Sequence, residues 1–148
     1  MVKSINEIID EFDTKYNIHL YKLPRKKIIY ANSDISLLVV MPYSKIYPRG
    51  NGWVDFTKKQ IDLYRQYKYA ISIFRLSNGL VYYVDLHMLS PLLKEENKFF
   101  NDREGEHWKL DIWSSHISPR KSKEILPIQA NDSSIISTIV NKINRLKD

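Results

Sequence analysis

The sequence predicts an α/β fold of the α+β kind, with one central mixed sheet of about five strands and three helices packed on it. Apolar residues recur at helical spacing near both ends of the chain, in 4–16 and 132–146. Between them lie runs rich in β-branched and aromatic residues, such as 26–31 and 35–41, and an Asn-Gly pair within 77–79 that is typical of a hairpin. At 148 residues the chain has the length of one domain, so we expect 1–148 to form a single unit.

Each of the N-terminal, middle and C-terminal helices has a recognisable start. Ser4 followed by Glu7 has the spacing of a capping box, Thr57 can cap the middle helix, and Asp132 or Ser133 the last one. The apolar stripes would be Ile5, Ile8, Ile9 and Phe12, then Ile61, Leu63, Tyr64 and Tyr67, then Ile135, Ile136, Ile139, Val140 and Ile143. These stripes predict helices that pack on a sheet.

The expected strands follow one another as antiparallel neighbours in the first half of the chain. Residues 18–23, 26–31 and 35–41 form three successive runs, with Asn32-Ser33-Asp34 as the turn before the third. The third run is apolar apart from Ser36, so we expect it to be central and covered on both faces. Two later runs, YAISIFRL and LVYYVDL, would form a hairpin around Asn78-Gly79.

The remaining segments are less regular. The loop 42–52 contains two prolines and two glycines, and 86–93 predicts a short helical turn. Residues 94–106 are charged and unpatterned, which indicates a surface excursion. Residues 107–113 alternate, with Trp108, Leu110 and Ile112 on one face, and ILPI is the last expected strand.

Composition excludes several classes of protein. Without cysteine there is no disulfide framework, thiolate nucleophile or cysteine-based zinc site. The N-terminus has acidic residues where a secretory signal needs an apolar run, and no apolar run could cross a bilayer, so we expect a cytoplasmic protein with no membrane partner. The four histidines lack metal-binding spacing and the four glycines form no phosphate loop. We therefore expect neither a metal site nor a cofactor.

Positive charge is concentrated in one part of the chain. The net charge is +6, and residues 18–75 alone carry eleven Lys or Arg against three Asp. Such a segment can form an electrostatic footprint for a polyanion, most often nucleic acid. It can equally be a lysine-rich solvated surface, so charge alone leaves the two alternatives open.

The stretch Tyr43–Trp53 interleaves cations with aromatic residues. Cations give sequence-independent phosphate contacts, and exposed aromatic rings can stack on bases. The alternative is an ordinary loop whose rings pack back onto the domain. On the first alternative the chain is a DNA-binding protein, and its nucleic-acid-binding residues are Lys22, Arg25, Lys26, Lys27, Tyr43, Lys45, Tyr47, Arg49, Trp53, Lys58 and Lys59.

Taken in order, the expected elements are a helix, three strands, a basic loop, a helix with Gln60 in its first turn, a strand pair and a terminal helix. This order resembles the restriction-endonuclease-like (PD-(D/E)xK) nuclease fold and is similar to that of archaeal Holliday junction resolvases. The resemblance rests on residues 27–64, 70–89 and 133–148. That family has an acid at the start of its second strand and an acid-x-Lys on the third. Here Lys26-Lys27 and Val40-Met41-Pro42 stand at those places, which implies a relative that binds DNA without cutting it.

Two other functions stay open. The first is a divalent-metal-dependent DNA endonuclease or junction resolvase with rearranged acids, which alone would need Mg²⁺ or Mn²⁺. Its catalytic candidates are Glu7, Asp10, Glu11, Asp34, Asp55 and Lys45. The second is a viral or mobile-element protein-interaction module with an aromatic face around Trp108 and Trp113. A homodimer is compatible with every one of these functions.

Overall fold

The computed structural model describes residues 1–147, and the side chains of residues 1–145. Its helices are α1 (Ile5–Lys15), α2 (Lys58–Arg65) and α3 (Ser134–Lys147), with two short 3-10 helices, η1 (Leu86–Leu92) and η2 (Glu95–Asn97). Its strands are β1 (Tyr21–Lys22), β2 (Ile29–Ala31), β3 (Leu37–Val40), β4 (Tyr43–Ser44), β5 (Gly52–Thr57), β6 (Tyr69–Leu76), β7 (Val81–Asp85), β8 (Lys98–Asn101), β9 (Gly105–Ile112), β10 (His116–Pro119) and β11 (Leu126–Pro127). None of the described helices is both long and apolar enough to cross a membrane.

The central sheet is mixed, which confirms the expected fold class. β1, β2 and β3 are antiparallel neighbours, and β3 pairs in parallel with the first half of β6. β4 continues the line of β3 and pairs in parallel with the second half of β6. β7 returns antiparallel along the other side of β6 through the expected hairpin, where Gly79 adopts a φ of +88°. A left-handed φ of this kind favours glycine over any residue with a Cβ atom.

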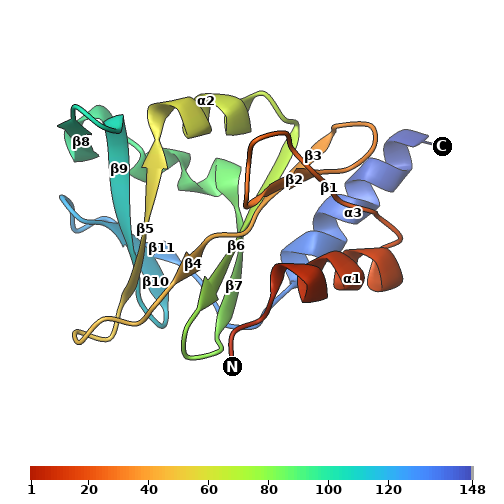
Figure 1. Cartoon of the computed structure of the whole chain (residues 1–148), viewed down its shortest axis with the longest axis horizontal. Coiled ribbons are helices and arrows are strands. Elements are labelled where there is room, and N and C mark those ends of the chain that lie inside the picture. Colours follow the sequence, from red (N-terminus) through yellow and green to blue (C-terminus); the bar gives the residue numbers. More distant parts are fainter. Residues whose placement is uncertain (148) are drawn as a thin grey trace.

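A second sheet packs against the first. It has the strand order β11-β10-β9-β5, with β8 also paired to β9, and every pairing is antiparallel. Figure 1 shows the central sheet between two layers, with α1 and α3 on one face and the second sheet with α2 on the other. The chain is therefore a three-layer domain in which β5 lies at an edge of the outer sheet.

The alternation of side chains along β3 builds two cores. Leu38 and Val40 point into the core between the two sheets, where they join Phe56 of β5 and Tyr64 of α2. Leu37 and Val39 point the other way, into the core beneath α1 and α3. All four side chains of the strand have no exposed surface, as expected for a central strand covered on both faces.

The helices begin where their capping residues predict. The Ser4 hydroxyl accepts a hydrogen bond from the Glu7 backbone N–H at 3.1 Å. Thr57 and Gln60 form a reciprocal capping box at the start of α2, because the Gln60 side chain also accepts from the Thr57 N–H at 2.9 Å. The Asp132 carboxylate accepts from the Ser134 N–H at 3.0 Å and starts α3.

The second sheet is the main departure from the sequence analysis. The segment 42–52 is more than a loop, since it contains β4 and the first residue of β5. The segment 94–106 lies at the surface but is ordered, forming η2, β8 and the turn into β9. Several expected strands are also shorter than their sequence runs: Lys26 and Lys27, for example, precede β2. The physical reason is that β5 pairs with β9, which is distant in the sequence, while β8 and β10 lie next to β9 in the sequence but contain only four residues each.

Candidate nucleic-acid interface

The exposed face of the second sheet is built by the alternation of side chains along β5. Val54 and Phe56 point inward and are buried, whereas Trp53, Asp55 and Thr57 point outward and are half-buried. The sequence GWVDFT thus gives one strand an apolar inner face and a mixed outer face.

Antiparallel pairing brings charged residues from far along the chain beside β5. Asp111 of β9 lies opposite Trp53, and Lys109 lies opposite Asp55. On the other side of β9, Phe99 of β8 lies opposite His107. The two rings stack with centroids 5.9 Å apart.

Cations and aromatic rings contact one another in a continuous series along this face, which we call the cation–aromatic chain. Its members are, in spatial order, Lys45, Tyr47, Trp53, Lys109, Phe99 and Lys121. The Lys45 Nζ lies 5.1 Å from the Tyr47 ring centroid, and the Tyr47 and Trp53 rings are 6.4 Å apart. The Lys109 Nζ lies between two rings, 4.9 Å from that of Trp53 and 5.6 Å from that of Phe99. The Lys121 Nζ then lies 4.2 Å from the Phe99 ring. Contacts of this length are cation–π interactions, which hold an ammonium group in place without neutralising it.

Two arginines flank the cation–aromatic chain. The Arg120 guanidinium lies 5.0 Å from the Trp53 ring and donates to Asp111 at 2.8 Å. That hydrogen bond raises the pKa of Arg120 above its ordinary value. The Arg49 guanidinium lies 5.9 Å from the centroid of the Trp113 ring. The Trp113 ring also stacks on the ring of His116. The aromatic rings of this surface therefore serve as supports for cations.

The carboxylates neutralise only part of this positive charge. Asp111 pairs with Arg120, and Asp55 lies 3.9 Å from the Lys109 ammonium. Among the described residues, Lys45, Arg49 and Lys121 are exposed and form no ion pair with a carboxylate. These three side chains keep their charge available for an anion from solution.

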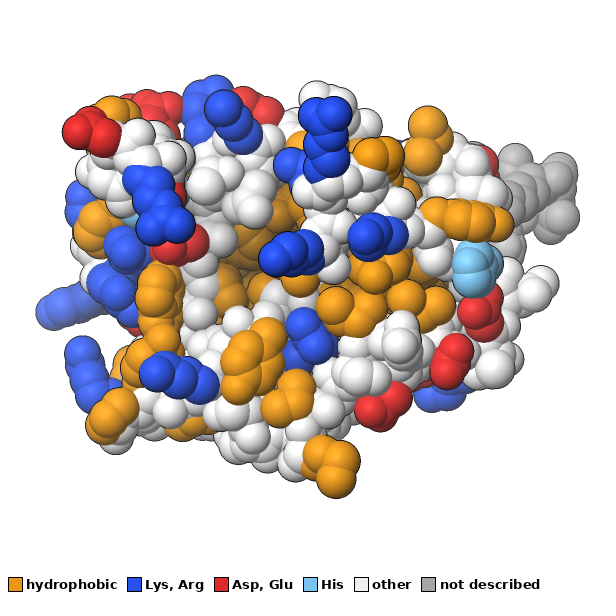
Figure 2. All heavy atoms as spheres, in the orientation of Figure 1, with side chains coloured by type: hydrophobic (Ala, Val, Ile, Leu, Met, Phe, Trp, Pro, Cys, Tyr) orange, Lys and Arg blue, Asp and Glu red, His pale blue; other side chains and the backbone are white. Residues whose placement is uncertain are grey.

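Two hollows open on either side of a wall formed by Tyr47 and Trp53, which line both. The β4–β5 hollow, of about 560 Å³, lies between β4 and the free edge of β5, and Ile28, Tyr43, Lys45 and Asp55 also line it. The Trp113 hollow, of about 680 Å³, is lined further by Arg49, Asn51, Asp111, Trp113, Ser118 and Arg120. Figure 2 shows a hollow with hydrophobic side chains at its floor and Lys and Arg side chains on both sides of it. Further Lys and Arg side chains lie toward the second sheet.

The free edge of β5 is partly closed by side chains. Its pairing with β9 leaves the N–H groups of Trp53, Asp55 and Thr57 pointing away from the sheet. The Ser44 hydroxyl accepts from the Trp53 N–H at 2.9 Å, and the Gln60 side chain accepts from the Thr57 N–H. The Asp55 N–H lies between these two capped positions.

The structure brings most of the expected phosphate-binding residues to one side of the molecule. Tyr43, Lys45, Tyr47 and Trp53 line the β4–β5 hollow, and Arg49 lines its neighbour. Lys22, Arg25, Lys26 and Lys27 are exposed on β1 and the turn that leads to Ile28 at the rim of the β4–β5 hollow. Lys58 and Lys59 are exposed on the first turn of α2, and Lys58 is paired with Asp62 at 2.9 Å.

The expected catalytic acids do not converge. Glu7, Asp10 and Glu11 lie on α1, on the opposite side of the central sheet from β5, where Glu11 pairs with Lys3. The Asp34 carboxylate accepts hydrogen bonds from Asn32 and Ser36 in the turn before β3. Of these acids only Asp55 shares a hollow with Lys45. Within the described residues no group of three or more His, Asp or Glu side chains could hold a metal ion.

Asp55 is in an unusual environment for a carboxylate. Burial raises its pKa above the ordinary value of 3.8, while the nearby Lys109 ammonium opposes that shift. The Asp55 Oδ1 atom is buried and has no hydrogen-bond partner. The Nε2 atom of the neighbouring His107 is also buried and also has no hydrogen-bond partner. The outer face therefore contains a carboxylate whose charge is disfavoured by its surroundings.

Sequence reasoning missed half of the cation–aromatic chain. Lys109 and Phe99 come from segments that were expected to be a strand and a surface excursion, and Lys121 follows them in the sequence. The strand alternation of 107–113 did place Lys109 on the face opposite Trp108, and the structure confirms Trp108, Leu110 and Ile112 as inward. Trp108 is only 7% exposed, so the expected aromatic face shared by Trp108 and Trp113 is wrong.

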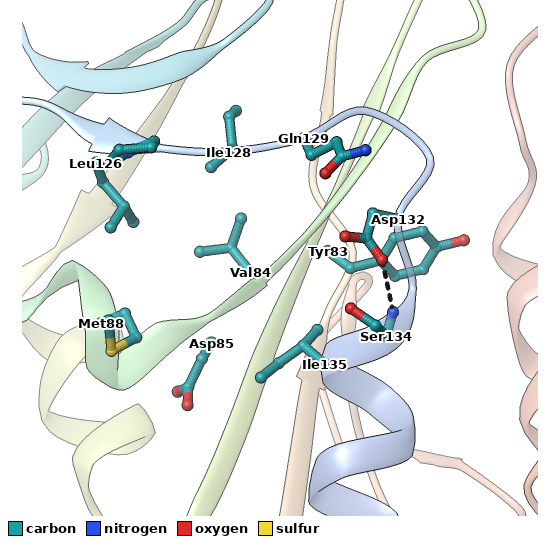
Figure 3. A pocket seen from close by; sticks show the side chains of 11 residues that line it. Tyr83, Val84, Asp85, Met88, Leu126, Ile128, Gln129, Asp132, Ser134 and Ile135 are labelled. Carbon is teal, nitrogen blue, oxygen red and sulfur yellow. Dashed lines mark hydrogen bonds between the residues drawn. The ribbon is translucent and has the colours of Figure 1, made fainter.

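A third cavity, of about 420 Å³, lies between β7, η1, β11 and the start of α3 (Figure 3). Val84, Met88, Leu126 and Ile128 give it an apolar wall, and no Lys or Arg lines it. Its two carboxylates act as helix caps, because Asp85 accepts from the His87 N–H and Asp132 from the Ser134 N–H. This cavity is not part of the basic surface.

Comparisons of the chain with protein-family models, with curated proteins and with solved structures give no match.

Proposed function

We propose that the protein is a non-catalytic nucleic-acid-binding protein that contacts phosphates through its basic surface. The observation that carries the proposal is the cation–aromatic chain, in which rings hold ammonium groups in place while Lys45 and Lys121 stay free of carboxylates. A cation that is already held in position loses less conformational entropy when it binds an anion. Contacts to phosphate of this kind supply most of the affinity of sequence-independent nucleic-acid binding.

The surface is extended enough for a polymer rather than a single anion. The cations of the β1–β2 turn border the β4–β5 hollow, and the cation–aromatic chain crosses the second sheet from there. We further propose DNA as the natural ligand and a nuclease-like fold that lacks the catalytic acids. What supports this is the order α1, β1–β3, basic loop, α2 with Gln60 in its first turn, then β6 and β7.

The direct test is binding of labelled single-stranded, duplex and four-way-junction DNA over a salt series, with and without Mg²⁺ or Mn²⁺, with the same samples run on a denaturing gel. Retention that weakens steeply with salt and leaves the DNA intact is the expected result. Absence of retention even at low salt would contradict the proposal.

One observation favours a second candidate, a divalent-metal-dependent endonuclease. Asp55 and Lys45 line the same hollow, which places one acid and one amine where a phosphate bound by the basic surface would lie. Cleavage that needs Mg²⁺ or Mn²⁺ and is abolished by Asp55→Ala would establish this activity, whereas intact DNA in every lane would favour the non-catalytic protein.

A further inference from the structure

The Trp113 hollow has the composition of a nucleobase pocket. Aromatic walls come from Tyr47, Trp53 and Trp113, and two arginines lie on those walls, Arg120 over Trp53 and Arg49 over Trp113. Unpaired bases stack both on aromatic rings and on the flat guanidinium of arginine. The volume of about 680 Å³ lies within the range of small-molecule sites.

The hollow also offers fixed polar groups that could recognise the edge of a base. Asn51 is only 7% exposed and donates to the Asp111 Oδ1 atom at 3.1 Å, which receives a second hydrogen bond from Arg120. The other carboxylate oxygen of Asp111 has only a long contact of 3.5 Å to Arg120. A carboxylate oxygen held in this way can accept from the amino group of a base.

We propose that this hollow binds an unpaired nucleobase, and that the protein therefore binds single-stranded nucleic acid in preference to duplex. This inference rests on the proposed function, because the cation–aromatic chain would hold the phosphates beside the hollow. In a duplex the faces of the bases are stacked on one another, so a base cannot enter a walled pocket unless it leaves the stack. The Asp111 carboxylate further favours bases that carry an amino group (adenine, cytosine, guanine) over thymine or uracil.

The decisive probe is an abasic strand, which keeps every phosphate and loses every base. Three fluorescently labelled DNAs of about a dozen nucleotides are compared at one low salt concentration by anisotropy: a mixed-sequence single strand, the abasic strand and the duplex. We expect the single strand to bind at least about 10-fold more tightly than the other two, since stacking of one base contributes about that much. Equal binding of the single strand and the abasic strand would overturn the inference while leaving the proposed function intact. No binding of any of the three would overturn both.

A variant that fills the hollow tests its location. Ser118 lines the hollow from β10 and is half-buried, so Ser118→Phe should occupy the space without removing a cation. We expect the variant to bind the single strand about 10-fold more weakly and the abasic strand unchanged. An unchanged preference for bases in a folded variant would place the base elsewhere and refute the assignment.

Tryptophan fluorescence of the unaltered protein gives a readout that does not depend on the variant. Trp53 and Trp113 line the hollow, whereas Trp108 is buried in the core. Stacking of a base should quench the emission of the first two, so the base-containing strand should quench and the abasic strand should not. Equal quenching by both strands at saturation would contradict the proposed pocket.

Discussion

Neutralising three of the exposed cations that form no ion pair with a carboxylate should weaken nucleic-acid binding by a calculable amount. The triple variant is Lys45→Gln, Arg49→Gln and Lys121→Gln. All three side chains are exposed, so their loss should leave the fold intact. Lys109 and Arg120 are left unchanged, because removing them would leave the carboxylates of Asp55 and Asp111 without their cationic partners.

The magnitude follows from counterion release. Each phosphate contact contributes about 0.7 to the slope of log K against log salt concentration for a single strand. Losing three contacts should lower the absolute slope by about 2. At 0.1 M salt each contact corresponds to about 5-fold in affinity, so the triple variant should bind about 100-fold more weakly.

The assay is fluorescence anisotropy of a labelled single strand at four or more salt concentrations. The matched control removes the same charge from the opposite layer, with Lys15→Gln, Lys142→Gln and Arg145→Gln on α1 and α3. These side chains are also exposed, so both variants have the same net charge. The control should keep most of the affinity and the slope of the unaltered protein.

Equal effects of the two triple variants would refute the reasoning. That result would mean that binding follows net charge alone and that the outer face of the second sheet has no special part in it. A large affinity loss with an unchanged salt slope would also contradict it, because phosphate contacts must alter the slope.

Three further predictions concern stability. Because burial raises the pKa of Asp55, the folded chain binds its proton more tightly than the unfolded chain, and stability falls as pH rises from 3.8 through the folded pKa. Asp55→Asn should therefore raise the Tm at pH 7, and the gain should vanish below about pH 4; a lower Tm at pH 7 would show that the Lys109 contact dominates. Ile35 is 64% exposed with a φ of +51°, so Ile35→Asn should raise the free energy of unfolding by about 1 kcal/mol in urea titrations, whereas no gain would mean that the backbone is unstrained. Leu38→Ala should lower the free energy of unfolding by about 2–5 kcal/mol, because the Leu38 side chain is fully buried. A loss below about 1 kcal/mol would contradict the packing described for β3.

The helices and the central sheet could be predicted from the sequence because their signals are local. Ser4 and Thr57 start helices that carry clear apolar stripes, and the turn at Asn78-Gly79 joins two strands of strong β character. The run Leu37–Val40 is apolar at every position, which a strand needs when both of its faces are covered. Each of these features depends on residues only a few positions apart.

The segments of β9 and β11 were expected to be strands, but their membership of a second sheet could not be predicted, because β5, β8 and β10 are too short to be recognised locally. β5 does alternate, but six residues between a Pro- and Gly-containing loop and a helix cap are too few to distinguish a strand. β8 and β10 contain four residues each and include polar or proline positions. The candidate site could not be predicted for the same reason. Lys109 and Trp53 come together only because β9 pairs with β5, more than fifty residues away in the sequence.

The capping box of α2 has a consequence beyond the helix itself. An edge strand exposes backbone donors that can recruit a strand from another molecule, which is a route to aggregation. On β5, the Gln60 side chain occupies the Thr57 donor at one end and the Ser44 hydroxyl occupies the Trp53 donor at the other. Only the Asp55 amide is left between them, so an incoming strand would find a single free donor on this edge. The capping box that starts the helix thus also protects the sheet from growing by intermolecular pairing.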